Sequence, residues 1–324
     1  MQIVTGMKIY DTILDASCVT IGNFDGVHRG HAEIFAHLKQ KSMERGLPSV
    51  VVTFEPHPLK VLTPDSAPLL ITTFAQKAAL IEAFGMDYLI VVPFSKELSQ
   101  LSAIDFVRNI LCRPLGMRHI IIGHDYAFGR NREGNFKTLT NLGALNGFTL
   151  EDLPPIGEKA VVFSSSLVRS AVTDGDLDAA SHILGRYYQI YGTVVHGREI
   201  GHMLGYPTAN ITTVNELVPA DGVYAVIADV DGHRVNGACS IGYNPTFGGN
   251  TRTIEVFLLD YSDRIYNHEI SLNFVQRLRP MQKYSDMTAL KRAISQDVVN
   301  TRIILKNLNT NYLKCSGRLE SRAR

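Results

Sequence analysis

The sequence predicts two domains, an α/β domain with a mostly parallel sheet followed by a small antiparallel β-barrel that ends in one long helix. The chain has 324 residues, and a domain usually holds about 100–200 residues, so there is room for two hydrophobic cores. The first half alternates short β-branched runs with helix-like segments, whereas the second half holds regularly spaced strands with little helix between them. We place the change of pattern, and with it the domain boundary, at about Gly185.

The first domain, residues 1–185, is predicted to be Rossmann-like. Its alternation of strands with helices indicates βαβ crossovers, and these crossovers place helices on both faces of a parallel sheet. The expected strands lie at 18–24, 49–54, 88–92 and 119–123, and the expected helices at 31–45, 74–84 and 103–111.

The second domain, residues 186–306, is predicted to be a small barrel because its strands are short, regularly spaced and bounded by turn residues. Asp231-Gly232 is a strong two-residue hairpin signal. A long amphipathic helix is expected at 286–305, and residues 307–324 form a polar, basic tail to which we assign no function. The expected strands lie at 187–195, 222–230, 233–240, 253–260 and 268–277.

The composition is that of an ordinary globular protein. The formal net charge of +1 provides no basic field for nucleic acid and no strong attraction to an anionic membrane. The N-terminus has no apolar signal region, and the longest apolar stretches are far too short to span a bilayer. We therefore expect a cytoplasmic protein without nucleic-acid or membrane partners. Metal-ligand spacing is lacking among the cysteines, which we expect to be unpaired thiols: Cys18, Cys112, Cys239 and Cys315.

Residues 22–31 have the features of a phosphate-binding turn. The segment leaves a strand, passes three glycines that allow close backbone approach, and enters a helix whose N-terminus favours anions. His28 and His31 are three residues apart, so both imidazoles can face one side of the turn and donate hydrogen bonds to phosphate oxygens. The alternative is a surface turn with two incidental histidines. The position of the motif, at the carboxyl end of the first strand, favours a functional site.

Residues 197–210 form a second glycine-rich segment, which ends in Pro207-Thr208-Ala209-Asn210. It is not a Walker loop, because no Gly-Lys-Ser/Thr follows. Thr208 and Asn210 offer two hard oxygens, two residues apart, to Mg²⁺ and phosphate. The alternative is a turn in which proline sets φ and asparagine caps it. Further along, Glu255 lies in an expected strand, where it could accept the proton of an alcohol or simply face solvent.

Several of these segments together resemble the bacterial bifunctional riboflavin kinase/FAD synthetases, whose first domain is an HxGH nucleotidylyltransferase. The resemblance covers nearly the whole chain except the tail, and it implies synthesis of FMN and then FAD. The segments that carry it are 22–31, 53–58, 123–129 with 132–135, 164–169, 197–210, 242–247 and 253–260.

In the first domain, the resemblance implies that His28 and His31 are catalytic and that His57 and Asp125 contact the flavin. Considered alone, Ser164 could simply cap a helix and Arg169 could pair with a carboxylate. The residues implied to bind ATP are Gly22, Asn23, Phe24, Asp25, Gly30, Ser164 and Arg169.

In the second domain, the resemblance implies that Thr208 and Asn210 hold metal and nucleotide and that Glu255 is the catalytic base. The implied ATP-binding residues there are Gly201, Gly205, Pro207, Thr208 and Asn210. One position departs from the family, which usually has arginine or lysine where this chain has His202. Histidine loses its charge near its usual pKa of about 6.5, so we expect the kinase KM for ATP to rise between about pH 6 and 8.

The expected substrates are riboflavin, FMN and ATP, with Mg²⁺ needed in both steps and no obligate protein partner. Two other functions fit parts of the sequence. An HxGH enzyme could transfer a nucleotide to a different phosphorylated acceptor, but the kinase-like barrel argues for FMN. A non-catalytic flavin sensor would have no need for both metal ligands and a base.

Overall fold

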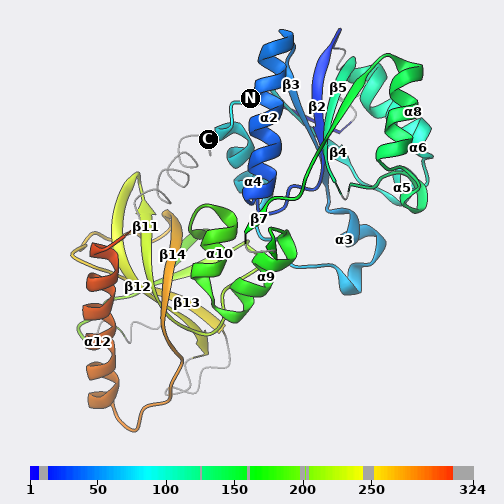
Figure 1. The fold of residues 1–324 in the computed structure, drawn as a ribbon. Helices are drawn as coiled ribbons and strands as arrows, with labels where there is room; N and C mark the ends of the chain where they lie inside the picture. The colour runs from blue at the N-terminus through cyan, green and yellow to red at the C-terminus, as the bar shows by residue number, and fades with distance from the viewer. Residues whose placement is uncertain are drawn as a thin grey trace. The chain divides into compact units, whose positions relative to one another are not determined.

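The computed structural model describes residues 1–6, 14–124, 126–158, 161–197, 201, 204–243 and 252–308. The chain divides into two compact units (Figure 1). The first unit holds Met1–Leu69 and Phe74–Ser164, and the second holds Leu70–Thr73 and Ser165–Arg324. A sequence-distant segment, Leu70–Thr73, therefore belongs to the second unit.

The first unit is built on a six-stranded sheet in the order β1-β4-β3-β2-β5-β6, with all neighbouring strands parallel. Helix α2 lies on one side of this sheet and helices α6 and α8 lie on the other (Figure 1). The strands are β1 Gln2–Thr5, β2 Ser17–Ile21, β3 Ser49–Glu55, β4 Tyr88–Pro93, β5 Met117–Gly123 and β6 Thr149–Leu153, with a separate hairpin of β7 Gly157–Glu158 and β8 Val161–Val162. The helical segments are α2 Arg29–Arg45, α3 Pro58–Leu62, η1 Pro64–Ser66, α4 Phe74–Ala83, α5 Lys96–Ser99, α6 Ala103–Phe106, η2 Val107–Cys112, α7 Arg113–Leu115, η3 Arg130–Arg132 and α8 Phe136–Asn146.

The predicted α/β class of this unit is confirmed, and its physical cause is visible in the central strands. Every residue of β2 is buried, as are six consecutive residues of β3. Strands that are covered on both faces need apolar side chains at successive positions, not alternation. Val50, Val51 and Val52 meet this requirement, and each is fully buried.

Three local features differ from the expectation. Strand β2 ends at Ile21, so the expected strand 18–24 is too long and the turn begins at Gly22. The expected helix 103–111 is a short α-helix that continues as a π-helix, Val107–Cys112. Strands β1 and β6 were not expected, because they are only four and five residues long and carry little periodicity.

The second unit contains a closed antiparallel barrel in the order β10-β13-β12-β11-β14-β9, which confirms the predicted barrel. The Asp231-Gly232 turn joins β11 to β12, and both residues have positive φ, as a type I′ hairpin requires. The elements are α9 Ser165–Asp174, α10 Leu177–Leu184, β9 Tyr188–Val195, β10 Ala209–Thr213, β11 Gly222–Val230, β12 His233–Tyr243, β13 Arg252–Leu258, β14 Glu269–Pro280 and α12 Met287–Lys306.

Helices cover this barrel from outside. Helix α12 packs against β11, β12 and β14, and its C-terminal turn places Leu305 in a cluster with Tyr187, Ile227 and Val275 (Figure 1). Helix α10 contacts β9 and β14. Helices α9 and α10 thus pack with the barrel although they precede Gly185, so the compact units divide at Ser164. The boundary at about Gly185, where the strand pattern starts, stays a prediction for the limits of the two catalytic domains.

No helix among the described residues is both long and apolar enough to cross a membrane. Cys18, Cys112 and Cys239 are free thiols, as expected, and Cys315 lies outside the described residues.

Candidate active sites

The first candidate site lies where β2 ends and α2 begins. Strand β2 is flanked by β3, from the next stretch of chain, and by β5, which is added on the opposite side. This is a point at which the direction of strand addition reverses, and open α/β sheets bind ligands beyond the carboxyl ends of strands at such points. The predicted 22–31 motif forms the connection between β2 and α2.

The connection has a strained backbone. Phe24 and Val27 have φ values of 49° and 41°, and Gly26 between them has 79°. A β-branched residue in this region is unfavourable, and each such non-glycine residue costs about 1–3 kcal/mol. Gly22 leaves room for this turn, because a Cβ added there would lie 2.9 Å from Cζ of the Phe24 ring and the ring would have to shift. The fold therefore maintains an unfavourable turn beside the helix N-terminus.

His28 and His31 lie together at this N-terminus. Their rings stack with centroids 3.7 Å apart and planes at 25°. His28 is the N-cap of α2, and its Nδ1 accepts the Gly30 N–H at 3.2 Å. In the neutral imidazole the ring proton is then on Nε2, so that atom is the donor. The Phe24 and His31 rings pack in a T-shaped arrangement with centroids 5.2 Å apart, which links the strained turn to the second histidine.

Lys77 is a residue of this region that our sequence analysis missed. It lies on α4, yet it is only 7% exposed. Its Nζ is 3.5 Å from the carbonyl oxygen of Asn23 and 3.8 Å from Oε2 of Glu55. Thr53 Oγ1 donates to the same carbonyl at 3.2 Å. A lysine within the predicted helix 74–84 gives no sequence signal of burial, since lysine normally faces solvent.

The other predicted residues of the first site are distributed as follows. Asp25 is 5% exposed within the turn. Ser164 directly precedes α9, and the carbonyl of its neighbour Phe163 lies 3.8 Å from the Cβ position of Gly30, beside the histidines. Arg169 is on α9 in the second unit, and its role in the first site remains a prediction.

The two predicted flavin contacts have different outcomes. His57 is buried and caps α3, accepting the Leu59 N–H at Nδ1 over 3.2 Å. This contact fixes the ring at the carboxyl end of β3, the strand next to β2. Asp125 lies outside the described residues.

The second candidate site is formed by two neighbouring barrel strands. Asn210 on β10 is directly opposite Glu255 on β13. Thr208 comes two residues before Asn210, and side chains two apart share one face of an extended chain. Thr208 Oγ1 accordingly donates to Glu255 Oε2 at 3.3 Å. Strand register thus brings all three predicted oxygen-bearing side chains together.

Glu255 is half-buried and has a second donor. Thr253 Oγ1 lies 3.1 Å from Glu255 Oε1, so both carboxylate oxygens are oriented by threonines. Thr253 is not among the predicted site residues, although its position two residues before Glu255 in a strand is a usable signal. Burial raises the pKa of the nearby Cys239 thiol, and the negative charge of the Glu255 carboxylate raises it further. Cys239 therefore remains a protonated thiol.

The glycines of the loop allow close packing around these groups. An added Cβ at Gly197 would lie 1.9 Å from Nδ2 of Asn210. One at Gly201 would lie 2.3 Å from the Tyr206 carbonyl and 3.0 Å from Oγ1 of Thr208. The Gly201 carbonyl in turn accepts the Leu204 and Tyr206 N–H groups. Gly205 has a φ of 82°, a conformation that disfavours other residues, and His202 lies outside the described residues.

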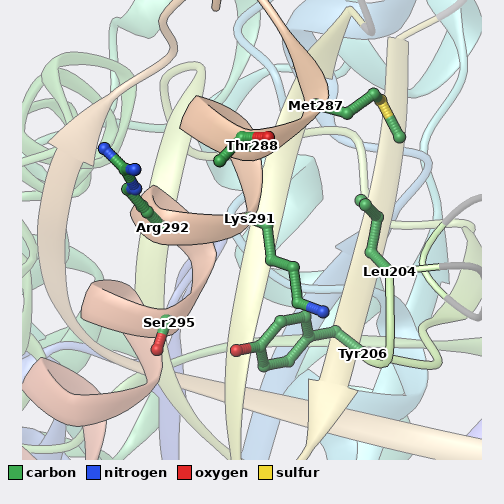
Figure 2. A pocket seen from close by; sticks show the side chains of 7 residues that line it. All are labelled: Leu204, Tyr206, Met287, Thr288, Lys291, Arg292 and Ser295. Carbon is green, nitrogen blue, oxygen red and sulfur yellow. The ribbon is translucent and has the colours of Figure 1, made fainter.

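A pocket of about 410 Å³ lies beside the same loop. It is bounded by the segment before Pro207 and by the first half of α12, and Lys291 extends toward the Tyr206 ring (Figure 2). The Tyr206 ring also packs edge-on against Phe257 of β13, at 5.4 Å. The lining residues are Leu204, Tyr206, Met287, Thr288, Lys291, Arg292 and Ser295.

The donor set of the second site suits magnesium. Among the described residues, no group of three histidine, cysteine or acidic side chains could hold a metal ion, so a site for a soft or borderline metal is not found there. Mg²⁺ instead prefers oxygen ligands, keeps several waters and is commonly held by one or two protein groups plus substrate phosphates. The hydroxyl of Thr208, the amide oxygen of Asn210 and the nearby Glu255 carboxylate fit that preference.

Comparisons with known proteins agree with this division into two sites. The family model described as FAD synthetase matches residues 11–167, and the model described as riboflavin kinase matches residues 184–305. A bifunctional riboflavin kinase/FMN adenylyltransferase of Pseudomonas fluorescens is 39% identical over 305 residues, covering 94% of this chain and 98% of that protein. The enzyme of the same description from Escherichia coli K12 is 34% identical over 304 residues, covering 93% of this chain and 97% of that protein.

A solved structure has the same fold over nearly its full length. It is described as a macrolide-efflux protein from Streptococcus pneumoniae, with a TM-score of 0.85 and 28% identity, covering 93% of this chain and 99% of that one. Its description names a different activity from the sequence relatives, which are more similar to this chain.

Proposed function

The chain belongs to the family of bifunctional riboflavin kinase/FMN adenylyltransferases, and we propose that its two ATP-dependent reactions take place at the two sites described above. The protein phosphorylates riboflavin to FMN and adenylylates FMN to FAD. The proposal assigns adenylylation to the turn that carries His28 and His31, and phosphorylation to the strand face that carries Thr208, Asn210 and Glu255.

In adenylylation, a phosphate oxygen of FMN attacks the α-phosphorus of ATP and pyrophosphate leaves. Negative charge increases on the phosphoryl oxygens during this displacement. His28 and His31 donate hydrogen bonds to those oxygens, and the N-terminus of α2 adds its positive dipole end. The stacked pair of imidazoles, 3.7 Å apart, is the observation that carries this assignment. Ser164, Arg169 and the 22–25 backbone bind the remainder of ATP, and His57 and Asp125 contact the flavin.

In phosphorylation, the 5′-hydroxyl of riboflavin attacks the γ-phosphorus and ADP leaves. Glu255 accepts the hydroxyl proton, and its two threonine donors hold the carboxylate in position. Gly201, Gly205 and Pro207 shape the loop around the phosphates. The pairing of Asn210 with Glu255 across neighbouring strands carries this assignment, because it places ligand and base within one site.

Mg²⁺ would be held by Thr208 and Asn210 together with ATP phosphates. When bound, it neutralises phosphate charge and aligns the transferred group. Protein groups then need only orient the acceptor, remove its proton and exclude water. We extend the metal requirement to adenylylation, where the same charge accumulates on pyrophosphate.

The pocket beside Tyr206 is proposed to hold the riboflavin ring. Its volume of about 410 Å³ is within the usual range for small-molecule sites, about 300–1,000 Å³. Tyr206 and Leu204 offer apolar contact to a flat ring, and Tyr206 is two residues from Thr208. A ring bound there would have its ribityl chain directed toward the metal loop.

Positional labelling of ATP tests the whole proposal. With riboflavin and Mg²⁺, label from γ-labelled ATP is expected in FMN and in FAD, and label from α-labelled ATP in FAD alone. Chromatography of the flavins measures both. An enzyme for another phosphorylated acceptor would put the α-label into no flavin, and a flavin sensor would transfer neither label. Location in the cytoplasm and the absence of nucleic-acid, membrane or obligate protein partners remain part of the proposal.

A further inference from the structure

The burial of Lys77 needs compensation. Lysine is almost never fully buried unless it is paired, because removing an ammonium from water is costly. Burial indeed lowers the pKa of Lys77, and the Glu55 and Asp25 carboxylates oppose that shift. A lysine kept at such a cost beside the ATP turn, on a helix that contributes none of the predicted site residues, calls for a functional explanation.

Lys77 and Thr53 both donate to one backbone oxygen, the carbonyl of Asn23. Lys77 Nζ is 3.5 Å from the Asn23 carbonyl oxygen, and Thr53 Oγ1 donates to the same oxygen from β3 at 3.2 Å. Glu55 Oε2 lies 3.8 Å from the same Nζ and forms an ion pair with it. The Asn23 carbonyl belongs to the peptide that leads into Phe24, the first residue with positive φ.

We propose that Lys77 is a positioning residue for adenylyl transfer, which holds the Asn23–Phe24 peptide and so fixes the strained turn that presents the two histidines. The turn is unfavourable by itself, so contacts from outside must select it. Lys77 from α4 and Thr53 from β3 supply two donors to one carbonyl. Phe24 then transmits the geometry, because its ring packs on His31 at 5.2 Å. The inference rests on the proposed roles of His28 and His31.

This role differs from that of a phosphate ligand in what it predicts for kinetics. A lysine that binds ATP directly would contribute mainly to ground-state affinity, and its loss would raise KM. A lysine that fixes the turn affects how well the histidines meet the transition state, and its loss lowers kcat. Misplacement of catalytic groups by about 1 Å can cost about 10²-fold.

The test measures FAD formation from supplied FMN, ATP and Mg²⁺ in the full chain, and compares Lys77→Met with Lys77→Arg. We expect Lys77→Met to lower kcat by about 10–100-fold with KM for ATP changed less than about 3-fold, and Lys77→Arg to recover most of the loss. Lys39→Met is the matched control, because Lys39 also forms an ion pair in this unit, with Asp87 at 3.3 Å, but away from the turn.

Thr53→Val provides a second variant if Lys77→Met fails to fold. It removes the other donor to the Asn23 carbonyl without leaving a buried charge unpaired. We expect kcat to decrease here too, but by less than in Lys77→Met. Unchanged kcat in Thr53→Val and in a folded Lys77→Met would overturn the inference, as would a loss confined to KM. A His28→Ala variant in the same assay distinguishes failure of the Lys77 inference from failure of the proposed first site. If His28→Ala retains FAD formation, the proposed first site itself is wrong.

Discussion

The two phosphate sites of this protein handle the same co-substrate by different structural means. In the first, the backbone is unusual: three residues of one turn have positive φ, and two of them are not glycine. In the second, Asn210 and Glu255 lie opposite each other on paired strands and Thr208 directly precedes one of these strands, so the three side chains converge through pairing register. One site is prepared by strain at a helix N-terminus, the other by the two-residue period of a strand.

The difference indicates where each site is vulnerable. The first site depends on residues that hold the turn, some of them distant in sequence, such as Thr53 and Lys77. The second depends on the three oxygen-bearing side chains themselves and on glycines that leave them room. Substitutions should therefore separate the two reactions cleanly.

Asn210→Ala should have the largest effect on the second site. It removes a proposed metal and nucleotide ligand, and loss of one preorganised electrostatic partner typically costs about 10²–10³-fold, so we expect FMN formation to fall by about 10³-fold. Initial rates with riboflavin and ATP measure this. FAD formation from supplied FMN should stay unchanged, and Asn236→Ala, at an exposed position of the same barrel, should leave both rates alone. A ligand role is excluded if Asn210→Ala forms FMN as fast as the Asn236→Ala control does.

Glu255→Gln should have the next largest effect. Positioning and the metal supply most of the acceleration in phosphoryl transfer. We therefore expect kcat to decrease by about 10²-fold, which is the lower end of the range for a general base. KM for riboflavin should change little, because the amide has the same shape, its oxygen still accepts from one threonine hydroxyl, and its NH2 donates to the oxygen of the other. The exposed Glu269→Gln on β14 serves as the control. A Glu255→Gln enzyme with normal kcat would remove the base assignment.

Gly197→Ala tests the packing around Asn210. The new Cβ would lie 1.9 Å from Asn210 Nδ2, so the asparagine must move, and we expect FMN formation to fall by about 10–100-fold. Because both changes act through Asn210, the Gly197→Ala/Asn210→Ala double variant should be no worse than Asn210→Ala alone. Additive losses would show that Gly197 acts elsewhere.

Tyr206→Ala should have the smallest effect, confined to riboflavin binding. Loss of an aromatic contact of about 0.5–1.5 kcal/mol corresponds to a KM for riboflavin raised by about 3–10-fold. Tyr206→Phe keeps the ring and should behave as the parent enzyme. Steady-state kinetics over riboflavin concentration measures both, and an unchanged KM in Tyr206→Ala would place the ring outside this pocket.

Much of the fold could be predicted from the sequence, for reasons that differ between the units. Runs such as 50–52, with three consecutive valines, indicate a strand buried on both faces, and Asp231-Gly232 marks a hairpin whose two residues do have positive φ. Short strands such as β10 escaped prediction, because five residues after a proline-containing loop carry too little periodicity.

The sites divide in the same way. His28 and His31, or Thr208 and Asn210, are close in sequence, so their spacing alone indicates a shared face. Lys77 and Thr53 are brought to Asn23 by the packing of α4 and by the pairing of β3 with β2. Nothing in the spacing of these residues predicts that contact, because tertiary structure creates it.

The central claim, that one chain carries two separate ATP sites with unlike chemistry, is tested most directly by the rates of FMN and FAD formation in His28→Ala. His37→Ala, on the same helix α2 but away from its N-terminus, is the matched control. We expect His28→Ala to lower FAD formation from supplied FMN by about 10²–10³-fold, the usual cost of one lost oxyanion donor, while FMN formation from riboflavin stays within about 2-fold of the parent enzyme, because sites that share no residues act additively. A parallel fall of both rates, or undiminished FAD formation, would contradict it.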